Sequence, residues 1–79
     1  MSLAEAIKST RMKLLLSQEG FAKELNVSVG SINRWANGKT KPNLIAMKAI
    51  KTFCEENILE YSLIEEEWLG YSNIKKDSK

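Results

Sequence analysis

The stretch QEGFAKELNVSVGSINRWAN, residues 18–37, decides the fold because its apolar residues are spaced for two short helices that touch. Phe21, Ala22 and Leu25 lie three and four residues apart and share one helical face. Asn26 interrupts this face where the chain needs a left-handed residue, a conformation that asparagine tolerates almost as well as glycine. A second apolar face begins after the interruption, so the stretch predicts two helices joined by a tight turn.

The second face belongs to Ile32 and Trp35, which we expect to pack in the core rather than to stack on another molecule. Ala22 is small at the point where the two helices have to cross closely. Helices over about 18–25 and 29–36 with a short turn between them form a helix-turn-helix arrangement.

A first helix is predicted before this pair. Ser2 and Glu5 form a capping-box pattern at its start. We expect the helix to end near Leu15 or Leu16, before Ser17, whose hydroxyl can cap the next helix. Its expected apolar face consists of Leu3, Ile7, Leu14 and Leu15.

Two further helices are predicted after the pair. Pro42 breaks the chain, and Asn43 can cap a fourth helix. The expected apolar face of that helix consists of Ala46, Ala49, Ile50 and Phe53, with Cys54 alongside. Ser62 and Glu65 form a second capping-box pattern, which predicts a fifth helix that ends at Gly70.

Length and composition agree with one small domain. Seventy-nine residues are enough for one domain and too few for two, and 43% hydrophobic residues are ordinary for a globular protein. We expect a compact all-α domain of five helices over residues 1–71. Residues 72–79 have little apolar content and are expected to fray.

Several residue types are scarce, which narrows the classes of function. The chain has no histidine, and its only cysteine, Cys54, cannot form an intrachain disulfide and is expected to be buried as a small apolar residue. Histidine is the commonest metal ligand and general base, so we expect no metal, no cofactor and no enzyme activity. No apolar run approaches the length of a membrane span and no signal-peptide pattern opens the chain, so we expect a cytoplasmic protein without membrane contact.

Charge is unevenly distributed along the chain, although the net value is only +2. Residues 1–54 contain nine basic and three acidic side chains (+6), whereas residues 55–79 contain three basic and seven acidic ones (−4). No acidic residue lies between Glu24 and Glu55, a stretch that includes the second helix of the pair and the loop after it. A basic face of this kind is suited to the phosphates of a nucleic acid.

Together these residues resemble the DNA-binding unit of the phage lambda repressor and Cro family, the XRE-type helix-turn-helix regulators. The likeness rests on Gln18, Ala22, Ile32, Trp35 and the loop Asn37–Pro42. It reaches roughly from Arg11 to Gly70, and Asn26 departs from the glycine that is usual in the family without preventing the same backbone conformation. The resemblance implies a lambda-repressor-like DNA-binding domain of bacterial or phage origin.

In the docking mode of this family, the helix over residues 29–36 enters the major groove of double-stranded DNA. The resemblance assigns base contacts to Ser28, Val29, Gly30, Asn33 and Arg34. Arg34 can donate two hydrogen bonds to guanine or can instead contact phosphate or solvent, and Asn33 can read adenine or lie free on the surface. Gly30 costs the helix about 1 kcal/mol relative to alanine, and it either permits close approach of the DNA backbone or simply faces solvent.

The resemblance assigns phosphate contacts to Arg11, Ser17, Gln18, Asn37, Lys39 and Lys41. In some members of the family, an acidic residue just before the Asn-Gly turn holds the arginine that corresponds to Arg11. Here that position is Ala36. We therefore expect Arg11 to be less rigidly placed than in those members.

The last predicted helix has an apolar cluster next to acidic residues, where the family often places its dimer contact. The cluster consists of Leu63, Ile64, Trp68 and Leu69. It either covers the small core or pairs with a second copy of the chain.

The leading hypothesis is a sequence-specific transcriptional regulator, a repressor that binds as a homodimer to a two-fold operator and occludes a promoter. Its half-sites are expected about one helical turn apart. The alternative is a protein-interaction module, such as an antitoxin or a tethering subunit, that holds a protein partner through the acidic C-terminal third. Loss of DNA binding with retention of a partner would favour the alternative.

Overall fold

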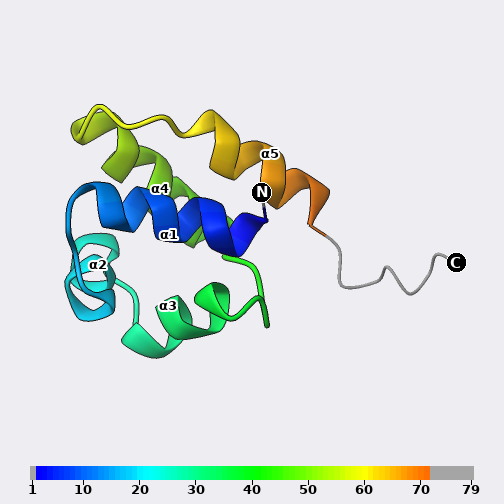
Figure 1. The fold of residues 1–79 in the computed structure, drawn as a ribbon, viewed down its shortest axis with the longest axis horizontal. Coiled ribbons are helices and arrows are strands. Elements are labelled where there is room, and N and C mark those ends of the chain that lie inside the picture. The colour runs from blue at the N-terminus through cyan, green and yellow to red at the C-terminus, as the bar shows by residue number, and fades with distance from the viewer. Residues whose placement is uncertain (1, 72–79) are drawn as a thin grey trace, which may run out of the picture.

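The computed structural model describes residues 2–71, which form five α-helices (Figure 1). In chain order these are α1 Leu3–Lys13, α2 Gln18–Leu25, α3 Val29–Ala36, α4 Leu44–Glu56 and α5 Ser62–Gly70. α1 packs on α3 and α5, and α2 packs on α3 and α4. In Figure 1, α1 crosses the middle of the molecule, with α3 on one side of it and α5 on the other. The all-α, lambda-repressor-like fold is confirmed, and the expectation for residues 72–79 lies outside the described residues.

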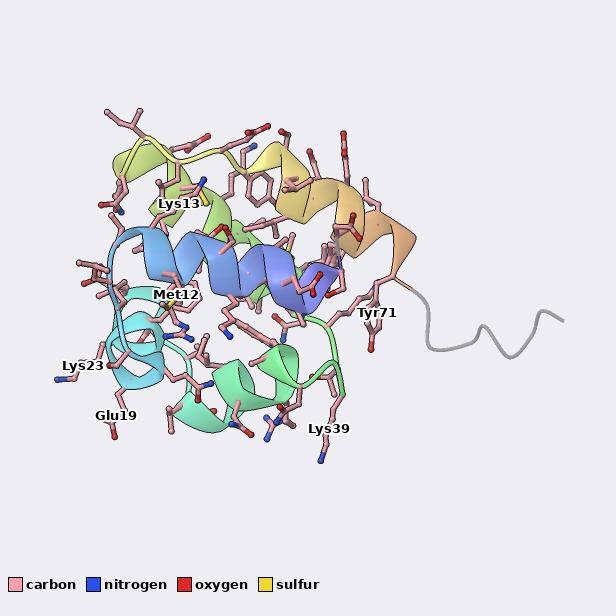
Figure 2. The ribbon with its side chains drawn as sticks, in the orientation of Figure 1. Met12, Lys13, Glu19, Lys23, Lys39 and Tyr71 are labelled. Carbon is pink, nitrogen blue, oxygen red and sulfur yellow. The ribbon has the colours of Figure 1, made fainter. Side chains whose placement is uncertain are left out.

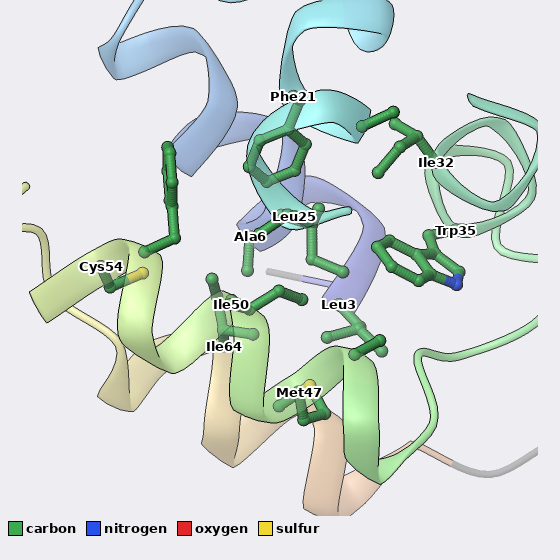
Figure 3. Close-up of a cluster of buried hydrophobic side chains, with 14 residues drawn as sticks. Leu3, Ala6, Phe21, Leu25, Ile32, Trp35, Met47, Ile50, Cys54 and Ile64 are labelled. Atoms are coloured by element: carbon green, nitrogen blue, oxygen red, sulfur yellow. The ribbon is translucent and has the colours of Figure 1, made fainter. Parts of the chain in front are cut away.

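A single core draws buried apolar side chains from all five helices. Figure 3 shows Phe21 and Leu25 of α2 pointing toward Ile50 of α4. The rings of Phe21 and Phe53 meet edge to face, with their centroids 5.4 Å apart. The predicted apolar faces of α2 and α3 are confirmed, because Phe21, Ala22 and Leu25, like Ile32 and Trp35, are buried.

The apolar face of α4 differs in one place from the prediction. Met47 is buried in the core, whereas Ala49, which was expected there, is only half-buried. The remaining members of the predicted face are buried as expected, and so is Cys54.

Side-chain caps set the starts of the first four helices. Ser2 and Glu5 form the predicted capping box, each side chain accepting from the other's backbone N–H at 3.1 Å. Ser17, Ser28 and Asn43 accept from backbone N–H groups at the starts of α2, α3 and α4. These starts are therefore fixed by the local sequence.

The start of α5 differs from the prediction. Tyr61 is the residue that precedes the helix, and no side chain caps it. The Ser62 hydroxyl donates instead to Glu60 Oε2 at 2.7 Å. Ser62 lies inside the helix and lacks the extended backbone that a capping serine needs, so the predicted capping box with Glu65 is wrong. The end of α5 at Gly70 is confirmed.

α1 ends at Lys13, earlier than the predicted end near Leu15 or Leu16. Leu15 has a left-handed φ of 55°, and Leu16 N–H donates to the Arg11 carbonyl across it, which is a Schellman ending. The Leu15 side chain is 87% exposed, so its assignment to the apolar face is wrong, while Leu14 is half-buried. The reversal at Leu15 turns the chain back so that α2 can pack on the core.

The tight turn between α2 and α3 has the predicted geometry. Asn26 is left-handed, with φ 58° and ψ 45°, and Val27 N–H donates to the Ala22 carbonyl at 3.0 Å. α2 and α3 therefore form a helix-turn-helix unit. Within residues 2–71, no helix has both the length and the apolar character that crossing a membrane requires.

Candidate nucleic-acid interface

α3 buries one face and turns the other away from the molecule. Ile32 and Trp35 point into the core, whereas Val29, Asn33 and Arg34 are exposed. Because residues four apart share a helical face, the structure brings together the residues expected to contact bases: Ser28, Val29, Gly30, Asn33 and Arg34. Ser28 lies at the margin as the cap of the helix.

The guanidinium of Arg34 folds back along α3 toward the start of the helix. Its Nη2 lies 3.4 Å from Ser31 Oγ, and Ser31 Oγ lies 3.0 Å from Ser28 Oγ. The first contact is long, which leaves the guanidinium able to move to a base. Ser31 was not assigned to the site from the sequence, although the three-residue spacing of Ser28, Ser31 and Arg34 already places all three on one stripe.

Gly30 is not required by the fold. A Cβ atom at this position would lie 3.5 Å from Arg34 Nη1 and 3.8 Å from Ser28 Oγ, which are ordinary van der Waals distances. The absence of a side chain at Gly30 leaves open the surface over which Arg34 lies.

Asn33 and Asn37 are paired at the end of α3. Asn37 Nδ2 donates to Asn33 Oδ1 at 3.1 Å. Bidentate recognition of adenine needs both the carbonyl and the amide of one asparagine. Asn33 keeps its own amide group and its second carbonyl lone pair for such a contact.

The loop after α3 has two exposed lysines. Gly38 is left-handed with φ 71°, and Lys39 N–H donates to the Arg34 carbonyl at 3.0 Å, which ends the helix. Lys39 points away from the body of the molecule (Figure 2). The ammonium of Lys41 instead lies 4.4 Å from the centroid of the Trp68 ring.

Arg11 is held by the backbone of the turn between α1 and α2. Its Nη1 donates to the Leu16 carbonyl at 2.7 Å. The left-handed turn at Leu15 presents this carbonyl to the guanidinium, in a chain that has Ala36 just before the Asn-Gly turn. Arg11 thus lies beside the start of α2, where Ser17 is exposed and Gln18 is half-buried.

A surface hollow of about 350 Å³ lies between α3, the following loop and the start of α4. It is lined by Val27, Ser31, Arg34, Trp35, Thr40, Lys41, Asn43, Ile45 and Ala46. Two of these side chains are cationic and none is acidic. The hollow therefore presents a positive surface next to the exposed face of α3.

The apolar cluster of α5 is split between the core and the surface. Ile64 is only 1% exposed and belongs to the core, so its side chain cannot reach a second copy. Leu69 is 69% exposed, Leu63 is also exposed, and Trp68 is half-buried. The members of this apolar cluster that can meet another molecule are thus Leu63, Trp68 and Leu69.

Two titratable groups with shifted pKa values lie away from α3, in α4 and directly before α5. Burial, and then the neighbouring Glu55, raise the pKa of the Cys54 thiol. Burial, Glu65 and Cys54 raise the pKa of Tyr61. Both groups are therefore neutral at physiological pH. Nowhere in residues 2–71 do three or more histidine, cysteine or acidic residues gather in a way that could hold a metal ion.

Comparison with known proteins identifies the family of the chain. Residues 7–60 match the family described as Helix-turn-helix. The HTH-type transcriptional activator BcrR of Enterococcus faecalis is a relative that is 35% identical over 81 residues, an alignment that covers 96% of this chain. The chain spans 40% of the length of that relative. No solved structure gave a significant match.

Proposed function

Since the chain belongs to the helix-turn-helix family of DNA-binding transcriptional regulators, we propose that it binds double-stranded DNA with α3 in the major groove. Asn33 and Arg34 contact base edges, Arg34 by two hydrogen bonds to a guanine. The observation that carries this proposal is the outward face of α3. It lies beside Lys39 and Lys41, in a stretch with no acidic residue between Glu24 and Glu55.

Phosphate groups on either side of the groove are contacted from two places in this proposal. Arg11, Ser17 and Gln18 act at the start of α2, where backbone N–H groups of the helix add donors. Asn37, Lys39 and Lys41 act at the end of α3 and in the loop after it. The short hydrogen bond from Arg11 to the Leu16 carbonyl supports this role, because it orients the guanidinium before DNA arrives.

We further propose that two copies bind a two-fold site and meet through α5. Leu63 and Leu69 are exposed on α5, and Leu69 lines a hollow of about 200 Å³ between α4 and α5. The rims of this hollow have opposite charges, Lys48 and Lys51 on α4 and Glu65 on α5. In a dimer whose two-fold axis passes beside this hollow, Lys48 and Lys51 of one copy face Glu65 of the other.

The sign of regulation is a separate part of the proposal. Promoter occlusion by a bound dimer gives a repressor. The name of the relative describes an activator, which favours the opposite sign. A reporter gene placed behind a promoter that carries the bound site distinguishes the two, because expression falls for a repressor and rises for an activator.

Selection of bound sites from a random duplex DNA pool at two salt concentrations, followed by sizing of the complex, tests the proposed function. An enriched inverted repeat bound by two copies is the expected result. Weak, salt-sensitive binding without enrichment would contradict sequence-specific regulation and favour the alternative of a protein-interaction module.

A further inference from the structure

The last helix is attached to the loop after α3 by two hydrogen bonds between residues distant in sequence. Trp68 Nε1 donates to the Pro42 carbonyl at 2.6 Å, and the Tyr71 hydroxyl donates to the Gly38 carbonyl at 3.2 Å. Figure 2 shows Tyr71 extending from the end of α5 toward this loop. The loop over residues 38–42 is thus held at both ends by aromatic side chains, one from α5 and one from the residue that follows it.

The same two rings also hold the side chain of a loop lysine. Lys41 Nζ lies 4.4 Å from the centroid of the Trp68 ring and 6.0 Å from that of the Tyr71 ring. Aromatic faces attract an ammonium group at these distances. Lys41 is nevertheless an exposed residue, so its N–H groups remain accessible to an anion.

Apart from these contacts, the loop is held at its far end by the buried ring of Pro42, while its middle has few constraints. Gly38 N–H and Lys39 N–H bond back to α3, but in the described part of the chain Thr40 and Lys41 make no backbone hydrogen bond. A glycine in the left-handed region begins the loop, and a free chain of this kind has many conformations to lose on binding. The aromatic contacts remove much of this freedom in advance.

We propose that Trp68 and Tyr71 are positioning residues for DNA binding. They hold the loop over residues 38–42 and the ammonium of Lys41 where the phosphate backbone passes the end of α3. This inference rests on the proposed function. It gives Trp68 a role within its own chain, apart from any contact with a second copy, and it connects α5 to the DNA-binding face.

A double-mutant cycle between Trp68 and Lys41 tests the proposal. The probe is a short labelled duplex that carries one half-site of the selected sequence, together with a random-sequence duplex, so that dimerisation does not contribute. Lys41→Gln should reduce by about one the magnitude of the slope of the logarithm of the binding constant against the logarithm of the salt concentration. Trp68→Phe keeps a ring and loses the indole N–H, and it should weaken binding about three- to tenfold.

The decisive comparison is the effect of Trp68→Phe on DNA affinity in the wild-type chain and in a chain that already carries Lys41→Gln. If Trp68 acts through Lys41, Trp68→Phe should have only a small effect in a chain that already carries Lys41→Gln, and by itself it should flatten the salt dependence. An equal loss of affinity in both backgrounds, with an unchanged salt dependence, would overturn the proposal. A wild-type protein that binds neither duplex would overturn the proposed function as well.

Tyr71→Phe provides a second test that spares the core. It removes only the hydroxyl that bonds to Gly38, so thermal unfolding should be unchanged while binding weakens about threefold. Tyr61→Phe is the matched control, because in residues 2–71 the Tyr61 hydroxyl makes no hydrogen bond to the loop. Equal affinities of the two variants and the wild type would exclude a positioning role for Tyr71.

Discussion

Arg11 and Arg34 are fixed to different degrees. Arg11 makes a hydrogen bond of 2.7 Å to a backbone carbonyl, whereas Arg34 makes one contact of 3.4 Å to the hydroxyl of Ser31. A phosphate contact gains from an arginine that is already oriented, while a base contact needs a guanidinium that can adjust to the groove. The two environments therefore suit the two roles proposed for these side chains.

Arg34→Ala is expected to cost about 1–3 kcal/mol of binding free energy on the preferred site and to relax specificity at one base pair. The loss follows from two hydrogen bonds to guanine that no other side chain replaces. Affinities for the selected site and for its single-base variants measure the effect. Lys39→Ala is the control and should weaken all sequences alike. If Arg34→Ala lowers the affinity for all these sequences equally, Arg34 contacts phosphate and not a base.

Cys54 should make the free energy of unfolding decrease at alkaline pH. Burial raises the pKa of its thiol above the ordinary value of 9.0, so the native state keeps a proton that the unfolded chain loses. Its contribution is therefore fully present below about pH 9 and declines as the pH rises through the folded pKa. Urea unfolding on either side of this pH should show the decline. Cys54→Ala should flatten it, and an identical pH profile in that variant would contradict the assignment.

Most residues of the candidate face could be predicted from the sequence, because α3 has a regular apolar stripe that leaves its other residues outward. For Ile64 the sequence left open whether it covers the core or meets a second copy, because only packing against the other helices shows which apolar residue of α5 is buried. The bonds from Trp68 and Tyr71 join residues 26 and 33 positions apart. Their only local signal is the three-residue spacing of the two aromatics.

Left-handed residues follow α1, α2, α3 and α4 at the ends of these helices: Leu15, Asn26, Gly38 and Ile58. Asn26 and Gly38 could be predicted, because asparagine and glycine adopt this conformation readily. Leu15 and Ile58 could not, since a leucine or a β-branched residue is a poor choice there and gives no signal of a turn. This is why the turn between α2 and α3 was predicted correctly, whereas the end of α1 was predicted too far along the chain.

Ile58→Gly is expected to stabilise the fold by about 1 kcal/mol. Ile58 has a φ of 54° and is 91% exposed, so glycine relieves backbone strain and gives up little buried area. Denaturation in urea measures the change. Asn26→Gly serves as the comparison and should gain less, because asparagine already tolerates the conformation. A destabilised Ile58→Gly protein would contradict the strain argument.

The distribution of charge over the whole molecule predicts a steep salt dependence of binding. If each copy neutralises about four phosphates, the log-log slope for a dimer is about −7. Lys39→Gln should reduce its magnitude by about two, one contact in each copy. Titrations over a range of salt concentrations provide the slope. A slope near zero would mean that the basic face does not contact the phosphate backbone.

Dimerisation through α5 can be tested without disturbing the core. Leu69→Lys places a charge in the proposed contact on a side chain that is largely exposed, so the mass in solution should fall to that of a monomer. Ile58→Lys changes an exposed apolar residue outside that contact and should leave the mass unchanged. Sedimentation measures both. A dimer that survives Leu69→Lys would remove this surface from the proposal.

Gly30 has a consequence for how the preferred DNA sequence can change over generations. A Cβ atom at this position meets only ordinary van der Waals distances, and nearly every other residue favours a helix more than glycine does, so the fold does not oppose a side chain there. The site faces the groove in the proposed docking, beside the residues that read bases. A single codon change at Gly30 can thus add a new recognition group while stability is kept, which gives the lineage a short route to a different operator.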